Sequence, residues 1–247
     1  MIKNLFNIIF SDFLTPYQAQ KKRILFIDLL RFIAIVLMVI YHFTYDLNMF
    51  ALVKVELFKG FWFVLPRIIV TLFMIASGMS FGLKNWQGTT VSERFKIFIP
   101  RLIKLFVFAA GISLVTFLAF PKNWIYFGTI HSFFTCTLLS IFFLPYKSGS
   151  LILGSMMVLN YVFKIIPLTD PLYFEGVKSM DFIPVYPWFG VFLIGFGLSK
   201  YIHLVKEITL SKPHFIQYVS QKTLPIYLLH QVLLVTLVFL ISKLASF

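Results

Sequence analysis

The sequence predicts an all-α fold, a polytopic transmembrane helical bundle of about seven spans with the N-terminus in and the C-terminus out. Three observations predict it. The 247 residues are 60% hydrophobic and only 13% charged, whereas soluble domains are about half apolar and a quarter charged. Long apolar stretches recur along the chain, and the mean hydropathy is +0.91. Lys and Arg are also concentrated in alternate loops, which predicts the orientation.

The spans are placed by their length, because about 20 apolar residues at 1.5 Å per residue cross the hydrocarbon core. Seven stretches qualify, namely residues 25–46, 61–83, 97–119, 128–145, 149–166, 183–201 and 223–243. The fourth and fifth are short and nearly contiguous, so they are expected to form a tight helical hairpin. The connecting loops are brief and no internal repeat is visible, so residues 25–247 are predicted to form one transmembrane domain.

Residues 1–24 are predicted to form an interfacial N-terminal segment. Residues 1–10 are apolar enough to lie on the membrane. Asp12, Pro16 and the basic cluster 21–23 then follow in place of a small-residue cleavage site. An amphipathic lead-in is therefore expected rather than a cleaved signal.

The net charge of +13 is explained best by loops that orient the chain against an anionic leaflet. With the N-terminus in the cytoplasm, 14 basic residues lie inside, six lie outside, and Arg31 and Arg67 lie within helices. The inner set is Lys3, Lys21, Lys22, Arg23, Lys84, Arg94, Lys96, Arg101, Lys104, Lys147, Lys200, Lys206, Lys212 and Lys222. The outer set is Lys54, Lys59, Lys122, Lys164, Lys178 and Lys243. No nucleic-acid partner is expected, and the single cysteine, Cys136, is interpreted as a packing residue.

The first span carries a polar stripe. Asp28, Arg31, His42 and Asp46 fall on one face of a helix with 3.6 residues per turn. Such groups are costly in hydrocarbon and are often functional. His42 and Asp46 are spaced i to i+4, so a carboxylate can orient an imidazole that acts as a general base. The alternative is structural: Asp46 ends the helix in interfacial water and His42 satisfies a neighbour.

The predicted topology brings ionisable residues from four spans to one depth near the outer face: His42, Asp46, Arg67, His131 and Asp181. His131 starts a helix rich in hydroxyl residues and is either a second proton-handling group or a structural hydrogen-bond partner. Arg67 demands an acceptor, which is a structural carboxylate or a substrate oxyanion.

The sixth span begins with Asp181, two prolines and Trp188 at the outer interface. Aromatic residues are common there, but prolines free backbone groups that are tolerated mainly where they line a cavity. In the last span, Tyr227, His230 and Gln231 place an imidazole and an amide about two turns deep. These three residues indicate a lined tunnel or, more simply, a hydrogen-bonded buried histidine.

The loop between the second and third spans and the helix after it are strongly basic. Most of that charge needs only the positive-inside rule. The remaining interpretation is a site for the phosphates of a nucleotide-like donor such as coenzyme A. The sequence contains no phosphate-binding glycine loop, zinc-type helix or cysteine cluster, so no metal is predicted.

Four segments, residues 31–48, 127–131, 184–190 and 224–231, resemble the catalytic domain of the heparan-alpha-glucosaminide N-acetyltransferase family and its bacterial relatives. They occur in the order that the family shows. The resemblance implies a multi-spanning acyltransferase in which His42 is catalytic and Asp46 orients it. It also implies acetyl-CoA as the donor, and an amino sugar or a glycan hydroxyl as the acceptor.

Together these considerations predict a membrane-bound, acyl-CoA-dependent acetyltransferase. It is expected to move an acetyl group from cytoplasmic acetyl-CoA to the acceptor at the outer face of the plasma (inner) membrane. Direct transfer and an acyl-histidine intermediate stay open, as does homo-oligomerisation. The alternative is a small proton-coupled transporter or permease, in which the polar stripe would be a proton relay; a third is a scaffold in which buried polar groups only specify packing.

The predicted site residues form three sets. The catalytic set is His42, Asp46 and His131. The substrate-binding set is Arg67, Asp181, Trp188, Tyr227, His230 and Gln231. The donor-binding set is Arg31, Arg94, Lys96, Arg101 and Lys104.

Overall fold

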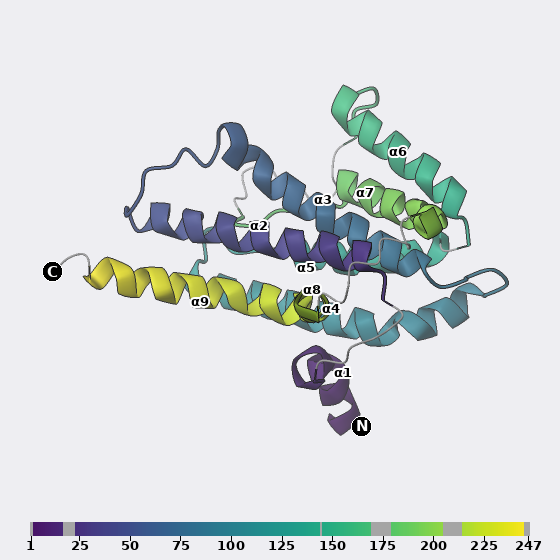
Figure 1. Cartoon of the computed structure of the whole chain (residues 1–247), viewed down its shortest axis with the longest axis horizontal. Coiled ribbons are helices and arrows are strands. Elements are labelled where there is room, and N and C mark those ends of the chain that lie inside the picture. The colour runs from purple at the N-terminus through teal and green to yellow at the C-terminus, as the bar shows by residue number, and fades with distance from the viewer. Residues whose placement is uncertain (1, 17–22, 144, 169–178, 205–213, 245–247) are drawn as a thin grey trace. The chain divides into compact units, whose positions relative to one another are not determined.

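The computed structural model describes residues 2–16, 23–143, 145–168, 179–204 and 214–244. Lys21, Lys22, Lys178, Lys206 and Lys212, which were counted for the orientation, lie outside these ranges. The helices are α1 (Ile2–Leu14), α2 (Leu25–Met49), α3 (Gly60–Gly82), α4 (Val91–Ala119), α5 (Thr129–Phe143), α6 (Lys147–Phe163), α7 (Val185–Leu198), the 3-10 helix η1 (Ser199–Leu204), α8 (His214–Gln221) and α9 (Thr223–Leu244) (Figure 1). No strand occurs in the described ranges, so the all-α prediction is confirmed.

Each of the seven predicted spans corresponds to a helix. Five helical stretches are long and apolar enough to cross a membrane: Leu25–Met49, Gly60–Gly82, Val91–Ala119, Val185–Leu204 and Thr223–Leu244. Helices α5 and α6 have 15 and 17 residues and fall below that length. The prediction of several helices suited to cross a membrane is therefore confirmed, and the count of seven stays a prediction.

Helix starts follow local chemistry. Thr90 precedes α4 and accepts a hydrogen bond from the backbone N–H of Glu93, while the Glu93 carboxylate accepts one from the Thr90 N–H. This capping box satisfies two backbone donors that the helix leaves free at its start. In α7, Tyr186 has non-helical backbone angles, so regular helical geometry begins only at Pro187.

The chain divides into two compact units, which are described one at a time. Unit 1 comprises Met1–Ser11 and Met74–Leu204, and unit 2 comprises Asp12–Phe73 and Val205–Phe247.

Helix α7 forms the core of unit 1. Phe192 and Phe196 are at most 1% exposed. Glycines allow its backbone to touch its neighbours: a Cβ on Gly195 would lie 2.4 Å from the carbonyl oxygen of Ile75 in α3. Small residues permit this close helix approach in membrane proteins.

The contacts of unit 1 also give helix directions. At the end of α4, Ser113 contacts His131 in the first turn of α5. At the start of α4, Arg94 donates to the carbonyl of Ile141 near the end of α5, at 2.7 Å. Helix α5 is therefore antiparallel to α4, and its 15 residues span roughly 22 Å.

In unit 2, α2 and α9 run parallel and side by side (Figure 1). Near the start of α2, Asp28 accepts a hydrogen bond from Ser220, at the end of α8, at 2.6 Å. Near the end of α2, Phe50 contacts Phe239 of α9. Helix α8 was not predicted, because its eight residues lie just before the last apolar stretch and include several polar side chains.

Candidate functional site

Two imidazoles meet between α2 and α9 of unit 2. The ring centroids of His42 and His230 lie 4.8 Å apart. Nδ1 of His230 lies 2.6 Å from the carbonyl oxygen of Tyr227. Because a carbonyl only accepts hydrogen bonds, Nδ1 carries the proton of the neutral ring and Nε2 has a free lone pair. His230 is 9% exposed, and its Nε2 has no partner among the described residues.

A buried carboxylate lies one helical turn from His42. Asp46 is completely buried, and its Oδ1 accepts a hydrogen bond of 2.9 Å from Nε2 of Gln231. The predicted hydrogen bond from His42 to Asp46 does not occur in the described structure, where Gln231 holds the carboxylate instead. Oδ2 of Asp46 and Oε1 of Gln231 are buried and have no partner in the part of the chain described.

The unpaired atoms of this cluster are all acceptors: a carboxylate oxygen, an amide oxygen and an imidazole nitrogen. An acceptor buried without a donor costs about 1–3 kcal/mol. The cluster is therefore suited to a ligand that brings several N–H or O–H groups. A neutral imidazole beside such a ligand can remove a proton from it.

Arg67 does not form the predicted structural ion pair with a carboxylate of the described residues. The Arg67 side chain is exposed, its guanidinium carbon lies 3.8 Å from the centroid of the Phe63 ring, and it donates to the Phe63 carbonyl. This cation–π contact is internal to α3 and leaves most guanidinium donors available.

In unit 1, His131 is hydrogen-bonded at both ring nitrogens. Its Nδ1 accepts from the N–H of Gly128 at 3.1 Å, so Nε2 carries the proton and donates to Ser113 Oγ at 3.0 Å. The Ser113 hydroxyl then donates to the carbonyl of Ile125 at 2.7 Å. The arrangement fixes the ring and matches the structural interpretation of His131.

Asp181 binds the first turn of α5. Its Oδ2 accepts hydrogen bonds from the N–H and the hydroxyl of Thr129, at 2.9 and 3.1 Å. A Cβ on Gly128 would lie 2.6 Å from that oxygen, so glycine gives the carboxylate room. Burial raises the pKa of the Asp181 carboxyl, and the two hydrogen bonds oppose the shift.

The predicted donor-binding residues have different environments. Arg94 is buried and donates to the carbonyls of Thr89 and Ile141, so it ties α4 to α5. Lys104 donates to Ser11 Oγ at 2.7 Å. Lys96 is exposed.

Arg101 lines a cavity of about 280 Å³ in unit 1. Its guanidinium lies over the Phe81 ring, 5.0 Å from the centroid. The ammonium of Lys84, a second cation that lines the cavity, lies 4.8 Å from the centroid of the Trp86 ring. Sequence reasoning placed Lys84 in the basic loop but did not assign Lys84 or Trp86 to the site. Two cations beside aromatic faces suit a ligand with phosphates and a flat base.

Three further predicted residues, Arg31, Tyr227 and Trp188, lie on helices α2, α9 and α7. Arg31 is partly exposed on α2, Tyr227 supplies the carbonyl that fixes His230, and Trp188 is partly exposed on α7. In the residues that the structure covers, no cluster of three His, Cys, Asp or Glu side chains could hold a metal ion.

Several apolar spans and a buried histidine–carboxylate cluster define an integral membrane protein with a polar site inside its helices. The family described as heparan-alpha-glucosaminide N-acetyltransferase, catalytic, matches residues 23–232, and the chain belongs to that family. The membership implies a membrane acetyltransferase and does not favour the transporter alternative. No curated protein and no solved structure matches the chain.

Proposed function

We propose that the chain transfers an acetyl group from cytoplasmic acetyl-CoA to an amino sugar or glycan hydroxyl at the outer face of the plasma (inner) membrane. The observation that carries this proposal is the imidazole pair beside unpaired buried acceptors on α2 and α9. A sugar brings several hydroxyl or amine donors, which these acceptors need.

In the proposed reaction, His42 accepts a proton from the acceptor amine or hydroxyl. The acceptor nitrogen or oxygen attacks the thioester carbonyl carbon, the C–S bond breaks, and the coenzyme A thiolate takes the proton from the imidazolium. Oδ2 of Asp46 and Oε1 of Gln231 hold the acceptor. His230, whose Nε2 lone pair is free, is a second proton acceptor beside His42.

Other predicted residues keep supporting roles in the proposal. The free guanidinium donors of Arg67 suit a developing oxyanion. His131, Asp181 and Trp188 are proposed to shape the outer part of unit 1, and Tyr227 is proposed as a wall for the acceptor beside His230 in unit 2.

The proposed donor site is the cavity at Arg101 and Lys84, where the phosphates and the base of coenzyme A find cations and aromatic faces. Exposed Lys96 adds positive charge, and Arg31 and Lys104 are proposed to attract the donor from the same side of the membrane. Arg94 is proposed to act only through the helix packing that its hydrogen bonds maintain.

Seven crossings with the N-terminus inside are part of the proposal. Because α2 and α9 run parallel, the number of crossings before α9 must be even. Both a total of five and a total of seven spans satisfy this condition. Helix α5 is antiparallel to α4 and contacts both Ser113 near the end of α4 and Arg94 near its start. That contact supports a separate crossing by α5, and hence by α6.

The test uses purified protein, radiolabelled acetyl-CoA and a panel of amino sugars and glycans. His42→Ala should lower turnover by about 10²–10⁴-fold, the usual contribution of a general base. His203→Ala is the matched control, because His203 is exposed in η1. Labelled product formed equally by both variants would sink the proposal. For a transporter, substrate flux would occur in proteoliposomes that contain no acyl donor.

A further inference from the structure

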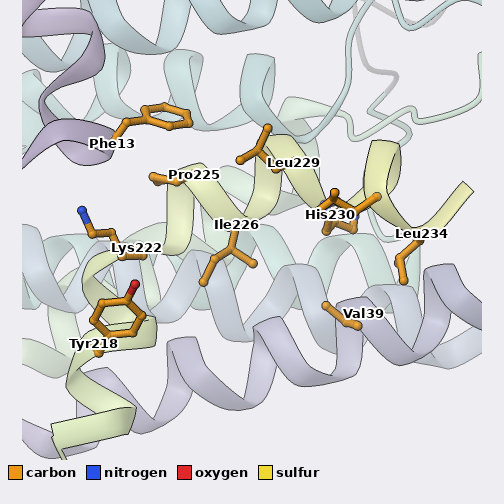
Figure 2. Close-up of a pocket in the computed structure, with 10 residues that line it drawn as sticks. Phe13, Val39, Tyr218, Lys222, Pro225, Ile226, Leu229, His230 and Leu234 are labelled. Atoms are coloured by element: carbon orange, nitrogen blue, oxygen red, sulfur yellow. The ribbon is translucent and has the colours of Figure 1, made fainter. Parts of the chain in front are cut away.

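Unit 2 contains a groove along α9 that the proposed reaction touches only at His230. It has a volume of about 490 Å³ and is walled mainly by apolar side chains, with Pro225, Ile226 and Leu229 along its length (Figure 2). Val39 of α2 and Phe13 of α1 add apolar surface. A groove of this composition favours a hydrocarbon ligand.

The two ends of the groove differ in chemistry. Lys222 and Tyr218 line one end, and His230 lies toward the other (Figure 2). Eight residues separate Lys222 from His230, which corresponds to about 12 Å along a helix. The occupant therefore needs a polar or anionic head and an apolar chain at least that long.

Lys222 keeps its positive charge available at the head end. Its ammonium donates to the carbonyl oxygens of Asp12 and Thr15, at 2.7 and 2.6 Å. Carbonyl oxygens are neutral, so these bonds position the ammonium without cancelling its charge. With the orientation proposed above, this end lies at the cytoplasmic leaflet, where anionic lipids are concentrated.

A pantetheine arm fits the groove less well. Its two amide groups would each need hydrogen-bond partners, and an amide buried without one costs stability. The wall between Lys222 and His230 offers apolar side chains, whereas an acyl chain needs no polar partner. Each buried methylene contributes favourably to binding.

From this geometry we infer that the groove binds an anionic phospholipid, with the phosphate at Lys222 and one acyl chain along α9 toward His230. The lipid fills the space beside His230 and so separates the imidazole pair from water entering along α9. The binding itself does not require acetyltransferase activity. Only the cytoplasmic placement of the head group rests on the proposed function.

The experiment measures lipid affinity of the detergent-purified full chain by native mass spectrometry. Phosphatidylglycerol and phosphatidylcholine with identical acyl chains are compared. Phosphatidylglycerol should bind on the order of tenfold more tightly, and Lys222→Gln should remove that preference. Lys243→Gln, at the other end of α9, should leave it intact.

A second variant tests the part of the groove that is proposed to hold the acyl chain of the lipid. Ile226→Trp should fill the groove and lower the affinity for both lipids on the order of tenfold. This is the effect expected if the indole excludes about two methylene groups of the acyl chain. Leu240→Trp is the control, because Leu240 is exposed on α9 and does not line the groove. Equal affinity for the two lipids, or unchanged binding by Ile226→Trp, would overturn the inference. Displacement of bound lipid by acetyl-CoA would overturn it in favour of a donor channel.

Discussion

At the scale of single residues, Asp46 concentrates the structural signs of a ligand site. It is fully buried, yet one of its two oxygens has no donor in the described structure. A carboxylate that served only packing would be expected to have both oxygens satisfied. Substitutions of Asp46 can therefore separate the effect of its negative charge on activity from the effect of its side-chain shape on stability.

Asp46→Asn keeps an oxygen that can accept from Gln231 but removes the negative charge. We expect kcat/KM for the acceptor to fall about tenfold to a hundredfold, because hydrogen bonds to charged groups contribute about 1.5–3 kcal/mol. Thermal stability should change little. Asp46→Ala also leaves Gln231 unpaired and should lower the melting temperature. Wild-type kinetics in Asp46→Asn would argue that the carboxylate does not touch the acceptor.

Asp181 allows a prediction about pH. Burial raises the pKa of its carboxyl above the ordinary value of 3.8, so the folded state holds the proton more tightly than the unfolded state. This contribution to stability is present at low pH and is lost as pH rises through the raised pKa. Asp181→Asn keeps an acceptor for Thr129 and should flatten the dependence. Apparent melting temperatures measured from about pH 4 to pH 7 test it; identical slopes for wild type and variant would contradict it.

Gly128→Ala probes the same contact from the other side. Its Cβ would lie 2.6 Å from Asp181 Oδ2, so the carboxylate must leave the first turn of α5. Loss of such a cap costs about 0.5–2 kcal/mol. Gly111→Ala in α4 is the control, because its Cβ meets nothing within 4 Å. The first variant should melt at a lower temperature than wild type, and the control should not.

The sequence located the polar residues better than it located their partners. The i to i+4 spacing placed His42 and Asp46 on one face, but helical periodicity does not tell which neighbouring helix that face meets. In the structure His42 meets His230, and Gln231 holds Asp46. Arg67 was expected to need a carboxylate or oxyanion partner because it lies within a span, yet its side chain is exposed and rests on Phe63.

At the scale of helices, an ion pair at the start of α2 is linked to α8 by hydrogen bonds with Ser220. Arg23 binds both carboxylate oxygens of Asp28, which is 2% exposed, and Ser220 donates to the same carboxylate. Removing one partner of a buried pair costs about 3–5 kcal/mol. Arg23→Ala should therefore lower the melting temperature strongly. Glu56→Ala breaks an exposed pair with Lys59 and is the control; equal effects of the two would show that the α2–α8 contact is not buried in solution.

Helix boundaries were predictable where hydropathy or capping changes sharply, as at Thr90 before α4. They were less predictable where the signal is short. Helix α8 has only eight residues, and α5 ends earlier than its apolar stretch suggested. The non-helical backbone at Tyr186 depends on tertiary packing around α7, which no local pattern encodes.

At the scale of the whole molecule, the open question is whether α5 and α6 each cross the membrane. The side chain of Lys147, at the start of α6, donates to the carbonyl of Gly82, the last residue of α3, at 2.6 Å. Lys200, after α7, donates to Ser148 at 3.2 Å. The α5–α6 connection thus lies at the same end of unit 1 as the ends of α3 and α7, which seven crossings require and five do not.

Cysteine labelling in intact cells tests this topology. Cys136 is fully buried, so a cysteine introduced at an exposed position is the main target of a membrane-impermeant maleimide. With seven spans, Ser148→Cys should be protected like Lys84→Cys, and Lys54→Cys should be labelled. With five spans, Ser148→Cys should be labelled like Lys54→Cys, because the chain would stay outside from the end of α4 to the start of α7. Permeabilised cells provide the control, since all three positions are exposed in the structure and should then react. Labelling of Ser148→Cys in intact cells would remove α5 and α6 from the crossings and leave α2, α3, α4, α7 and α9 as the membrane-spanning set.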